Sequence, residues 1–206
     1  MNVLIIGASG RTGGLLVQKA VALGHTVTAF VRDPRAWAAP KGVRVVQGDA
    51  RDPGSLGLAA AGQDAVLSAF GPKSLKKGDV QEALMRNLVA GMRKAGVKRI
   101  VNLSAVGILD SAPEAPFFYR TVLMPLYVKH VFADKTGGEE LLIASGLEYT
   151  NVRPGYLLNR PARGGVKAAL SGKGLKFTMT RADLADFMLA QLTDPAWIGR
   201  SPMIGY

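Results

Sequence analysis

Residues 2–13 read NVLIIGASGRTG, and this stretch decides the fold. Its first five residues are mainly apolar and β-branched, which is typical of a strand buried on both faces of a parallel sheet. Three glycines follow at a spacing of three, Gly7, Gly10 and Gly13, and residues 14–22 then predict a helix. A strand, a glycine turn and a helix in this order are typical of a site that binds the phosphates of a nucleotide.

Each glycine has its own physical role in such a turn. Gly7 lets the chain turn tightly, Gly10 allows the backbone to approach a pyrophosphate, and Gly13 permits close packing of the helix on the strand. The helix N-terminus offers unpaired N–H groups and the positive end of its dipole to the anion. A purely structural turn is the alternative, but the flanking strand and helix favour a nucleotide site.

The composition limits the classes of function. The 206 residues suit one domain over residues 1–206, and the absence of cysteine excludes disulfides, thiolate nucleophiles and cysteine metal sites. Only two histidines are present, so no metal site is expected. No apolar run approaches the roughly 20 residues that span a bilayer, and the first strand begins too early to leave room for a signal segment. We therefore expect a cytoplasmic protein without a membrane span.

The net charge of +11 is large for a chain of this size. Such an excess attracts polyanions, and nucleic acid is one alternative. Aromatic residues do not interleave with the basic ones as a single-strand binding platform would require, so nucleic acid is not expected as a partner. Solubility and attraction of a polyanionic cofactor explain the charge more simply.

Strand-like and helix-like segments alternate along the rest of the chain. Strands are predicted at residues 26–31, 43–47, 64–70, 98–104, 148–153 and near 175–178. Helices are predicted at residues 55–61, 79–95, 130–145 and 181–193, and a basic loop at 160–174. Thr180 and Asp183 have the spacing of a capping box that begins the last helix.

This alternation predicts βαβ units and a mostly parallel sheet. Right-handed crossovers then give a doubly wound sheet of order 3-2-1-4-5-6, with helices on both faces and a seventh strand left open. The predicted fold class is α/β, a single-domain NAD(P)-binding Rossmann fold. Chemistry is expected at the carboxyl ends of the strands, where the strand order reverses.

The end of the second strand bears on the choice of cofactor. An NAD site would place an acidic residue about 20 positions after the glycines, but Arg32 stands 19 residues after Gly13, and Arg11 lies inside the turn. Two guanidinium groups are suited to a 2′-phosphate, which favours NADP(H). NAD(H) stays open because Asp33 could reach a ribose hydroxyl. Asp49, after the third strand, either accepts a hydrogen bond from adenine or forms a turn.

Candidate residues for the reaction follow the fourth and fifth strands. Phe70 and Gly71 end the fourth strand, where a glycine allows the backbone to pass close to a ribose or simply to turn. Ser104 ends the fifth strand, where its hydroxyl would face the nicotinamide, or else cap the strand end. Lys135 lies early in the predicted helix of residues 130–145, and its ammonium would hold the ribose hydroxyls or point to solvent.

These residues carry a family resemblance that extends over nearly the whole chain. The matching runs are VLIIGASGRTG, the V-x-x-F-V-R-D type segment at 27–33, V-V-x-G-D at 45–49, G-x-D-A-V at 62–66, V-K-R-I-V-x-x-S at 97–104, K-x-x-x-E-E-L-L-x-x-S-G-L-x-Y-T at 135–150, V-R-P-G at 152–155 and R-A-D-L-A at 181–185. The chain resembles the atypical short-chain dehydrogenases/reductases of the NAD(P)H-binding group. That group includes NmrA-like proteins, biliverdin-IXβ and flavin reductases, and epimerase-like proteins.

The resemblance implies where the cofactor binds. It places the pyrophosphate region at the glycine turn, the 2′-phosphate at Arg32, the adenine side at Asp49, and the nicotinamide side at Ser104 and Lys135. The cofactor-binding residues expected in this way are Gly7, Ser9, Gly10, Arg11, Thr12, Gly13, Arg32, Asp49, Ala50, Phe70, Gly71, Ser104, Lys135 and Pro154.

The chain departs from the family at the catalytic tyrosine. The common family pattern is Tyr-x-x-x-Lys, and counting back from Lys135 places Val131 at the tyrosine position. Valine cannot transfer a proton, which excludes standard alcohol oxidation from that position. A histidine found near the active site of some flavin/biliverdin reductases, which also lack the tyrosine, would correspond to Gly155.

Other groups are candidates to replace the missing tyrosine. Ser104 and Lys135 are the predicted catalytic residues, and the tyrosines considered as substitutes are Tyr119, Tyr127 and Tyr156. The aromatic and Met-containing segment 117–128 suits a flat apolar substrate or, alternatively, packing on the core or on a second subunit. Together with this segment, residues 105–130 and 155–206 are expected to form the substrate side of the domain.

Three functions fit these observations. The first is an NADPH-dependent reductase of a small conjugated acceptor such as a flavin, quinone or tetrapyrrole. The second is a redox sensor that binds NADP(H) without turnover, favoured by Val131. The third, an epimerase or dehydratase acting on a nucleotide sugar, is disfavoured by the absent tyrosine and the small C-terminal region. A homodimer is left open.

Overall fold

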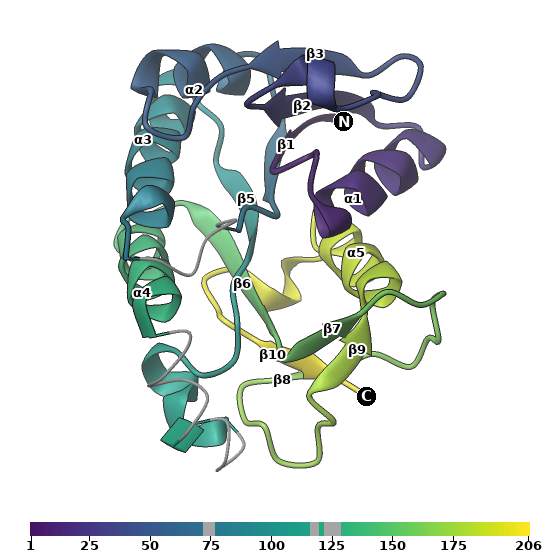
Figure 1. The fold of residues 1–206 in the computed structure, drawn as a ribbon, viewed down its shortest axis with the longest axis vertical. Helices are drawn as coiled ribbons and strands as arrows, with labels where there is room; N and C mark the ends of the chain where they lie inside the picture. The colour runs from purple at the N-terminus through teal and green to yellow at the C-terminus, as the bar shows by residue number, and fades with distance from the viewer. Residues whose placement is uncertain (72–76, 116–119, 122–128) are drawn as a thin grey trace.

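The predicted alternation of strands and helices is present in the computed structural model, which describes residues 1–71, 77–115, 120–121 and 129–206 (Figure 1). The central sheet contains β1 (Asn2–Ile6), β2 (Thr26–Val31), β3 (Arg44–Gln47), β4 (Ala65–Ser68), β5 (Arg99–Leu103), β6 (Glu148–Pro154), β8 (Lys167–Ala169) and β10 (Met203–Gly205). The helices are α1 (Arg11–Ala22), α2 (Pro53–Ala60), α3 (Val80–Ala95), α4 (Lys129–Ile143) and α5 (Arg181–Ala190).

The sheet has the predicted doubly wound topology. Its strand order is β3-β2-β1-β4-β5-β6-β10-β8, so the predicted order 3-2-1-4-5-6 is confirmed. Strand β10 occupies the seventh place, parallel to β6, and β8 adds an antiparallel eighth strand. β7 (Tyr156–Leu158) and β9 (Thr178–Thr180) form a separate parallel pair, called here the β7–β9 ribbon.

The core consists of two apolar layers, one on each face of the sheet. In β1 the side chains alternate: Val3 and Ile5 pack toward α1 and α5, whereas Leu4 and Ile6 pack toward α2, α3 and α4. Figure 1 shows these two sets of helices on opposite sides of the sheet. Burial on both faces explains why β1 is an uninterrupted apolar run. No helix in the described ranges is long and apolar enough to cross a bilayer.

The turn between β1 and α1 depends on a close approach that only glycine permits. A Cβ atom added at Gly13 would lie 2.0 Å from the carbonyl oxygen of Gly7, and Gly7 itself has a φ of +76°. Helix α1 begins at Arg11 and not at the expected residue 14, so Gly13 lies within the first turn of the helix. The helix can therefore pack directly on the carboxyl end of β1.

The C-terminal region differs most from the expected elements. The basic segment 160–174 contains β8, the strand expected near 175–178 lies at 178–180, and β7 and β10 were not predicted. These strands have three residues each, too few to show a period of two. Gly155 permits the close approach at the start of the ribbon, since a Cβ there would lie 2.1 Å from the oxygen of Phe177.

Helix α5 begins with a buried hydrogen-bonded carboxylate. Thr180 caps the helix by accepting a hydrogen bond from the Asp183 N–H at 3.0 Å, as a capping box requires. The reciprocal bond of the box does not form, because the Thr180 N–H donates to the Tyr206 hydroxyl instead of the Asp183 carboxylate. The Asp183 carboxylate also accepts hydrogen bonds from the N–H groups of Arg163 and Gly164, both at 2.9 Å, and from the hydroxyl of Tyr206. Burial alone would raise the pKa of Asp183, but these hydrogen bonds outweigh it and lower the pKa to about 2.

We expect Gly13→Ala to lower the free energy of unfolding by about 2 kcal/mol or more, because the new methyl group would overlap a backbone oxygen. Gly14→Ala is the matched control. Its Cβ would lie 3.7 Å from the Ala8 oxygen, an ordinary contact, and alanine favours the helix by about 0.5–1 kcal/mol. Urea denaturation measures both variants, and equal stabilities for the two would contradict the argument.

We expect Asp183→Asn to lower the free energy of unfolding by about 2 kcal/mol at pH 7. The pKa of Asp183 is depressed in the folded state, so its contribution is complete above pH about 4 and disappears as the pH falls toward about 2. The difference between wild type and variant should shrink over that range. The control is Asp186→Asn. Asp186 lies on α5 like Asp183 but is exposed, and it pairs with Lys19 of α1, so its loss should cost less than about 1 kcal/mol. A pH-independent difference for Asp183→Asn would contradict this assignment.

Candidate functional site

The glycine turn presents an uncapped helix end at the carboxyl side of the sheet. Gly10 is the N-cap of α1 and has no side chain with which to cap the helix, and the first turn of the helix contains no acidic residue. Ser9, Gly10 and Arg11 are exposed there, whereas Thr12 and Gly13 are buried. A helix N-terminus of this kind, with its N–H groups and dipole free of a protein anion, fits the pyrophosphate of a dinucleotide.

Besides Arg11, a second cation lies near this turn: Arg181, at the start of α5, which the sequence did not suggest. Burial, and secondarily the positive charge of Arg11, lowers the pKa of the Arg181 guanidinium. Arg181 donates hydrogen bonds to the oxygen of Leu157 and to Oδ1 of Asn159, both at 2.8 Å. It therefore ties the start of α5 to the β7–β9 ribbon and places that ribbon near the glycine turn.

The carboxyl ends of β2 and β3 carry the residues predicted for the adenosine half. Arg32 follows β2 directly and is exposed. Asp33 is engaged locally, because its Oδ1 accepts a hydrogen bond from the Arg35 N–H at 3.0 Å and caps the short helix of residues 34–36. Asp49 likewise accepts a hydrogen bond from the Arg51 N–H at 2.8 Å, so it forms a turn. A contact from Asp49 to adenine stays a prediction.

The other predicted cofactor residues lie at the ends of neighbouring strands. Ala50 is buried after β3, and Phe70 is half-buried against the apolar layer formed with α2 and α3. A Cβ at Gly71 would meet nothing within 4 Å, so the described structure does not require glycine there. The oxygen of Pro154, at the end of β6, accepts a hydrogen bond from the Val106 N–H at 3.0 Å.

Lys135 points from α4 toward the end of β5. Its Nζ donates hydrogen bonds to the oxygen of Leu103 at 3.2 Å and to Oε1 of Gln81 at 3.3 Å. Burial lowers the pKa of this ammonium to about 8, although the nearby carboxylates of Glu139 and Asp134 partly oppose the shift. Lys135 is therefore positively charged at neutral pH but close to its titration range.

Ser104 is bonded to a buried ion pair. Its hydroxyl donates a hydrogen bond to Oε2 of Glu139, and the other oxygen of that carboxylate accepts from Nε and an Nη of Arg153 at 3.0 and 2.6 Å. The exposed fractions of Ser104, Glu139 and Arg153 are 4%, 1% and 0%. A further Nη of Arg153 lies 2.8 Å from Oδ1 of the exposed Asp110. The hydroxyl is therefore held in one orientation by a carboxylate whose charge is balanced.

Sequence reasoning missed the structural roles of Glu139, Arg153 and Asp134. Asp134 accepts hydrogen bonds from the N–H groups of Gln81 and Glu82 at 3.0–3.1 Å, so a side chain of α4 caps the N-terminus of α3. The spacing of four between Lys135 and Glu139 could have indicated a shared helix face. The contacts across to α3, β5 and β6 have no signal in a single sequence.

Lys135 and Glu139 line one small cavity at the carboxyl ends of β4 and β5. Its lining includes Ser68, Phe70, Gln81, Asn102, Lys135 and Glu139. The structure thus brings together the predicted residues Phe70 and Lys135, and Ser104 joins them through Glu139. In the described part of the chain, no group of three His, Cys, Asp or Glu residues is placed to hold a metal ion.

None of the tyrosines considered as substitutes for the missing catalytic tyrosine is among the described residues that line the cavity at Lys135. Val131 lies one turn before Lys135 on α4 and is partly buried. Tyr156 is 71% exposed on β7, near Arg181. Tyr119, Tyr127 and nearly all of the segment 117–128 lie outside the described residues.

Comparison with known proteins agrees with this geometry. A family described as NAD(P)H-binding matches residues 7–195. The uncharacterized sugar epimerase YhfK of Bacillus subtilis (strain 168) is 30% identical over 208 residues, which cover 94% of this chain and 89% of that protein. Sterol demethylase protein B of Methylococcus capsulatus is 34% identical over 122 residues, but the match covers 55% of this chain and only 37% of that longer protein.

Solved structures give the same result. ChuY, described as an anaerobillin reductase from Escherichia coli O157:H7, superposes with a TM-score of 0.84 and is 26% identical, covering 100% of this chain and 97% of that one. The matched family spans almost the whole chain, including the glycine turn and α4. The chain therefore belongs to the NAD(P)H-binding family and, within it, to the atypical short-chain dehydrogenases/reductases.

Proposed function

We propose that this protein is a reductase that uses NADPH to reduce a flat, conjugated small molecule such as a flavin, a quinone or a tetrapyrrole. The observation that carries the proposal is the cluster of Ser104, Lys135 and Glu139 at the carboxyl end of β5, where the family places its reacting groups. Val131 occupies the tyrosine position beside it, so the acceptor should be one that needs no tyrosine as proton donor.

The chain's own residues would hold the cofactor and orient its reacting end. The uncapped N-terminus of α1 would bind the pyrophosphate, and Lys135 and Ser104 would lie on the nicotinamide side. When bound, NADPH supplies a hydride. Lys135, with a pKa of about 8, keeps a positive charge and an available proton there at neutral pH. A conjugated acceptor can also take its proton from solvent, so orientation and exclusion of water would supply most of the rate enhancement.

The preference for NADPH over NADH rests on the end of β2. Arg32 is exposed there, and Arg11 is exposed in the glycine turn, so two guanidinium groups are available to a 2′-phosphate. Asp33, the residue that would favour NADH, already accepts a hydrogen bond from the Arg35 N–H. The described arrangement therefore supports a phosphate rather than a hydroxyl at this position.

Similarity to other proteins supports a reductase more than an epimerase. ChuY, which matches over its whole length, is described as an anaerobillin reductase, and the relative YhfK is described as an uncharacterized sugar epimerase. Sugar epimerisation in this family uses the tyrosine that is replaced here by Val131. Epimerisation of a nucleotide sugar is therefore less well supported than reduction of a small acceptor.

A redox sensor that binds NADP(H) without turnover is the second candidate. It is favoured by Val131 and by the state of Ser104, which is 4% exposed and bonded to a charge-balanced carboxylate. In that case the Ser104 network would hold α4 against β5 and β6 without taking part in a reaction.

We expect Arg32→Gln to weaken NADPH binding by about tenfold or more, because a charge-assisted contact to the 2′-phosphate is lost. NADH affinity should stay within about twofold. Fluorescence titration with each cofactor measures this. Arg44→Gln, at the opposite end of the neighbouring β3, removes the same charge away from the site and should change neither affinity. Equal NADPH and NADH affinities in the wild type would contradict the assignment of Arg32.

We expect the wild type to consume NADPH with at least one of FMN, a quinone or a linear tetrapyrrole. Ser104→Ala should lower the turnover number about tenfold or more while leaving NADPH affinity nearly unchanged. Ser104→Thr, which keeps the hydroxyl, should retain more activity, and the thermal unfolding midpoint of each variant separates lost function from lost structure. No turnover with any acceptor would favour the sensor, and an unchanged rate for Ser104→Ala would remove Ser104 from the reaction.

A further inference from the structure

One cleft in the described structure lies beside the β7–β9 ribbon, and it is distinct from the small cavity at Lys135. Its volume is about 670 Å³, within the range of about 300–1,000 Å³ that holds small organic ligands. Its lining residues are Leu158, Arg160, Pro161, Arg163, Lys176, Phe177, Thr178, Thr180 and Tyr206. None of them lines the cavity at Lys135 or is among the predicted cofactor residues.

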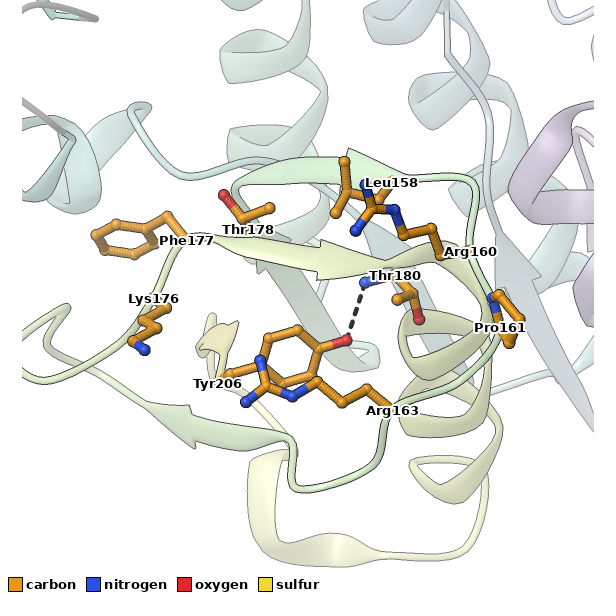
Figure 2. A pocket seen from close by; sticks show the side chains of 9 residues that line it. All are labelled: Leu158, Arg160, Pro161, Arg163, Lys176, Phe177, Thr178, Thr180 and Tyr206. Carbon is orange, nitrogen blue, oxygen red and sulfur yellow. Dashed lines mark hydrogen bonds between the residues drawn. The ribbon is translucent and has the colours of Figure 1, made fainter.

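The lining combines apolar walls with three cations. The apolar and aromatic lining residues are Leu158, Pro161, Phe177 and Tyr206. The basic ones are Arg160, Arg163 and Lys176, and no Asp or Glu side chain is in the lining. Figure 2 shows where these side chains lie: Leu158 is on β7, Thr178 and Thr180 are on β9, Lys176 and Phe177 precede β9, and Arg163 lies over the ring of Tyr206.

The three cations have no ion-pair partner within the described ranges. No carboxylate oxygen there lies within 4.0 Å of the charged groups of Arg160, Arg163 or Lys176. A surplus of basic residues makes some unpaired cations inevitable on this surface. Their gathering around one mostly apolar cleft is the informative feature, because each remains available to an anion.

Hydrogen bonds to the Asp183 carboxylate hold one wall of the cleft in place. Both oxygens of Asp183 accept hydrogen bonds from the N–H groups of Arg163 and Gly164, and one also accepts from the Tyr206 hydroxyl. That hydroxyl in turn accepts a hydrogen bond from the Thr180 N–H at 3.1 Å, drawn as a dashed line in Figure 2. The Arg163 guanidinium lies 4.5 Å from the centre of the Tyr206 ring. The stacked pair therefore gives the cleft a preformed, flat and cationic wall.

We propose that this cleft is a second binding site, which takes an organic anion with a flat ring system. The ring would lie against the Arg163–Tyr206 wall and the apolar side chains, and a carboxylate or phosphate would face Arg160, Arg163 and Lys176. Guanidinium groups suit both functions: they stack on rings and bind carboxylate or phosphate through two hydrogen bonds. The site is independent of the proposed reductase activity, since it needs neither Lys135 nor a bound cofactor.

The test is equilibrium binding of FMN and riboflavin, which share a ring system but differ by one phosphate. Titrations are made with saturating NADP⁺ present, so that the cofactor site is filled. We expect FMN to bind at least about tenfold more tightly than riboflavin, and Arg160→Gln and Arg163→Gln each to weaken FMN binding about tenfold. Lys167→Gln, an exposed position on β8 outside the lining, is the matched control and should leave FMN affinity within about twofold. Inorganic phosphate should compete with FMN only weakly, because it lacks the ring.

Several results would overturn the proposal. Equal affinities for FMN and riboflavin would show that the cations do not bind the anion, and unchanged FMN affinity in both arginine variants would show that the cleft is not the site. FMN binding that is abolished by saturating NADP⁺ or by Lys135→Gln would place the ligand in the cofactor or reaction site instead. The thermal unfolding midpoint of Arg160→Gln, whose side chain is exposed, verifies that its fold is intact. An absence of NADPH turnover would bear only on the proposed reductase and would leave this binding test unaffected.

Discussion

The ion pair between Glu139 and Arg153 is the interaction on which the candidate reaction site depends. Both side chains are almost fully buried, so each charge is acceptable only because the other is present. Removing one partner of such a pair typically costs about 3–5 kcal/mol, far more than an exposed ion pair contributes. The pair fixes α4 against β6 and leaves one carboxylate oxygen to hold the Ser104 hydroxyl at the end of β5. The packing of α4 and the orientation of Ser104 in the candidate site therefore depend on the same carboxylate.

Most of the central sheet was predictable because its inner strands β1, β4 and β5 are buried on both faces. A strand such as β1 must be apolar at every buried position, here Val3 to Ile6, and the helices between the strands show where each crossover occurs. The strands β7, β8 and β10 could not be found in the same way. Each has three residues, and each is defined by the strand that it meets rather than by its own pattern.

The candidate site also has one part that is local in sequence, and was predictable, and another that depends on distant contacts, and was not. The glycine turn is local in sequence, so the close contact of Gly13 with Gly7 follows from a motif within seven residues. The partners of Ser104, Lys135 and Asp134 lie 32 to 54 residues away along the chain. Their motifs could be recognised, but the hydrogen bonds that give them roles depend on how α3 and α4 pack together. The cleft at the β7–β9 ribbon depends on Tyr206 meeting Arg163, and nothing in the sequence joins those two residues.

Val131 stands where the family pattern has a tyrosine, and this changes which groups on one face of α4 can titrate. Residues 131, 135 and 139 follow one another at helical spacing, so valine, lysine and glutamate share one face of the helix. A tyrosine at the first position would depend on the lysine to lower its pKa. With valine there, no phenol stands one turn before Lys135 for the lysine to act on, and the pKa of the lysine itself is lowered to about 8. Under the proposed function, this helix face gives Lys135 both a charge to hold a cofactor and a proton to give.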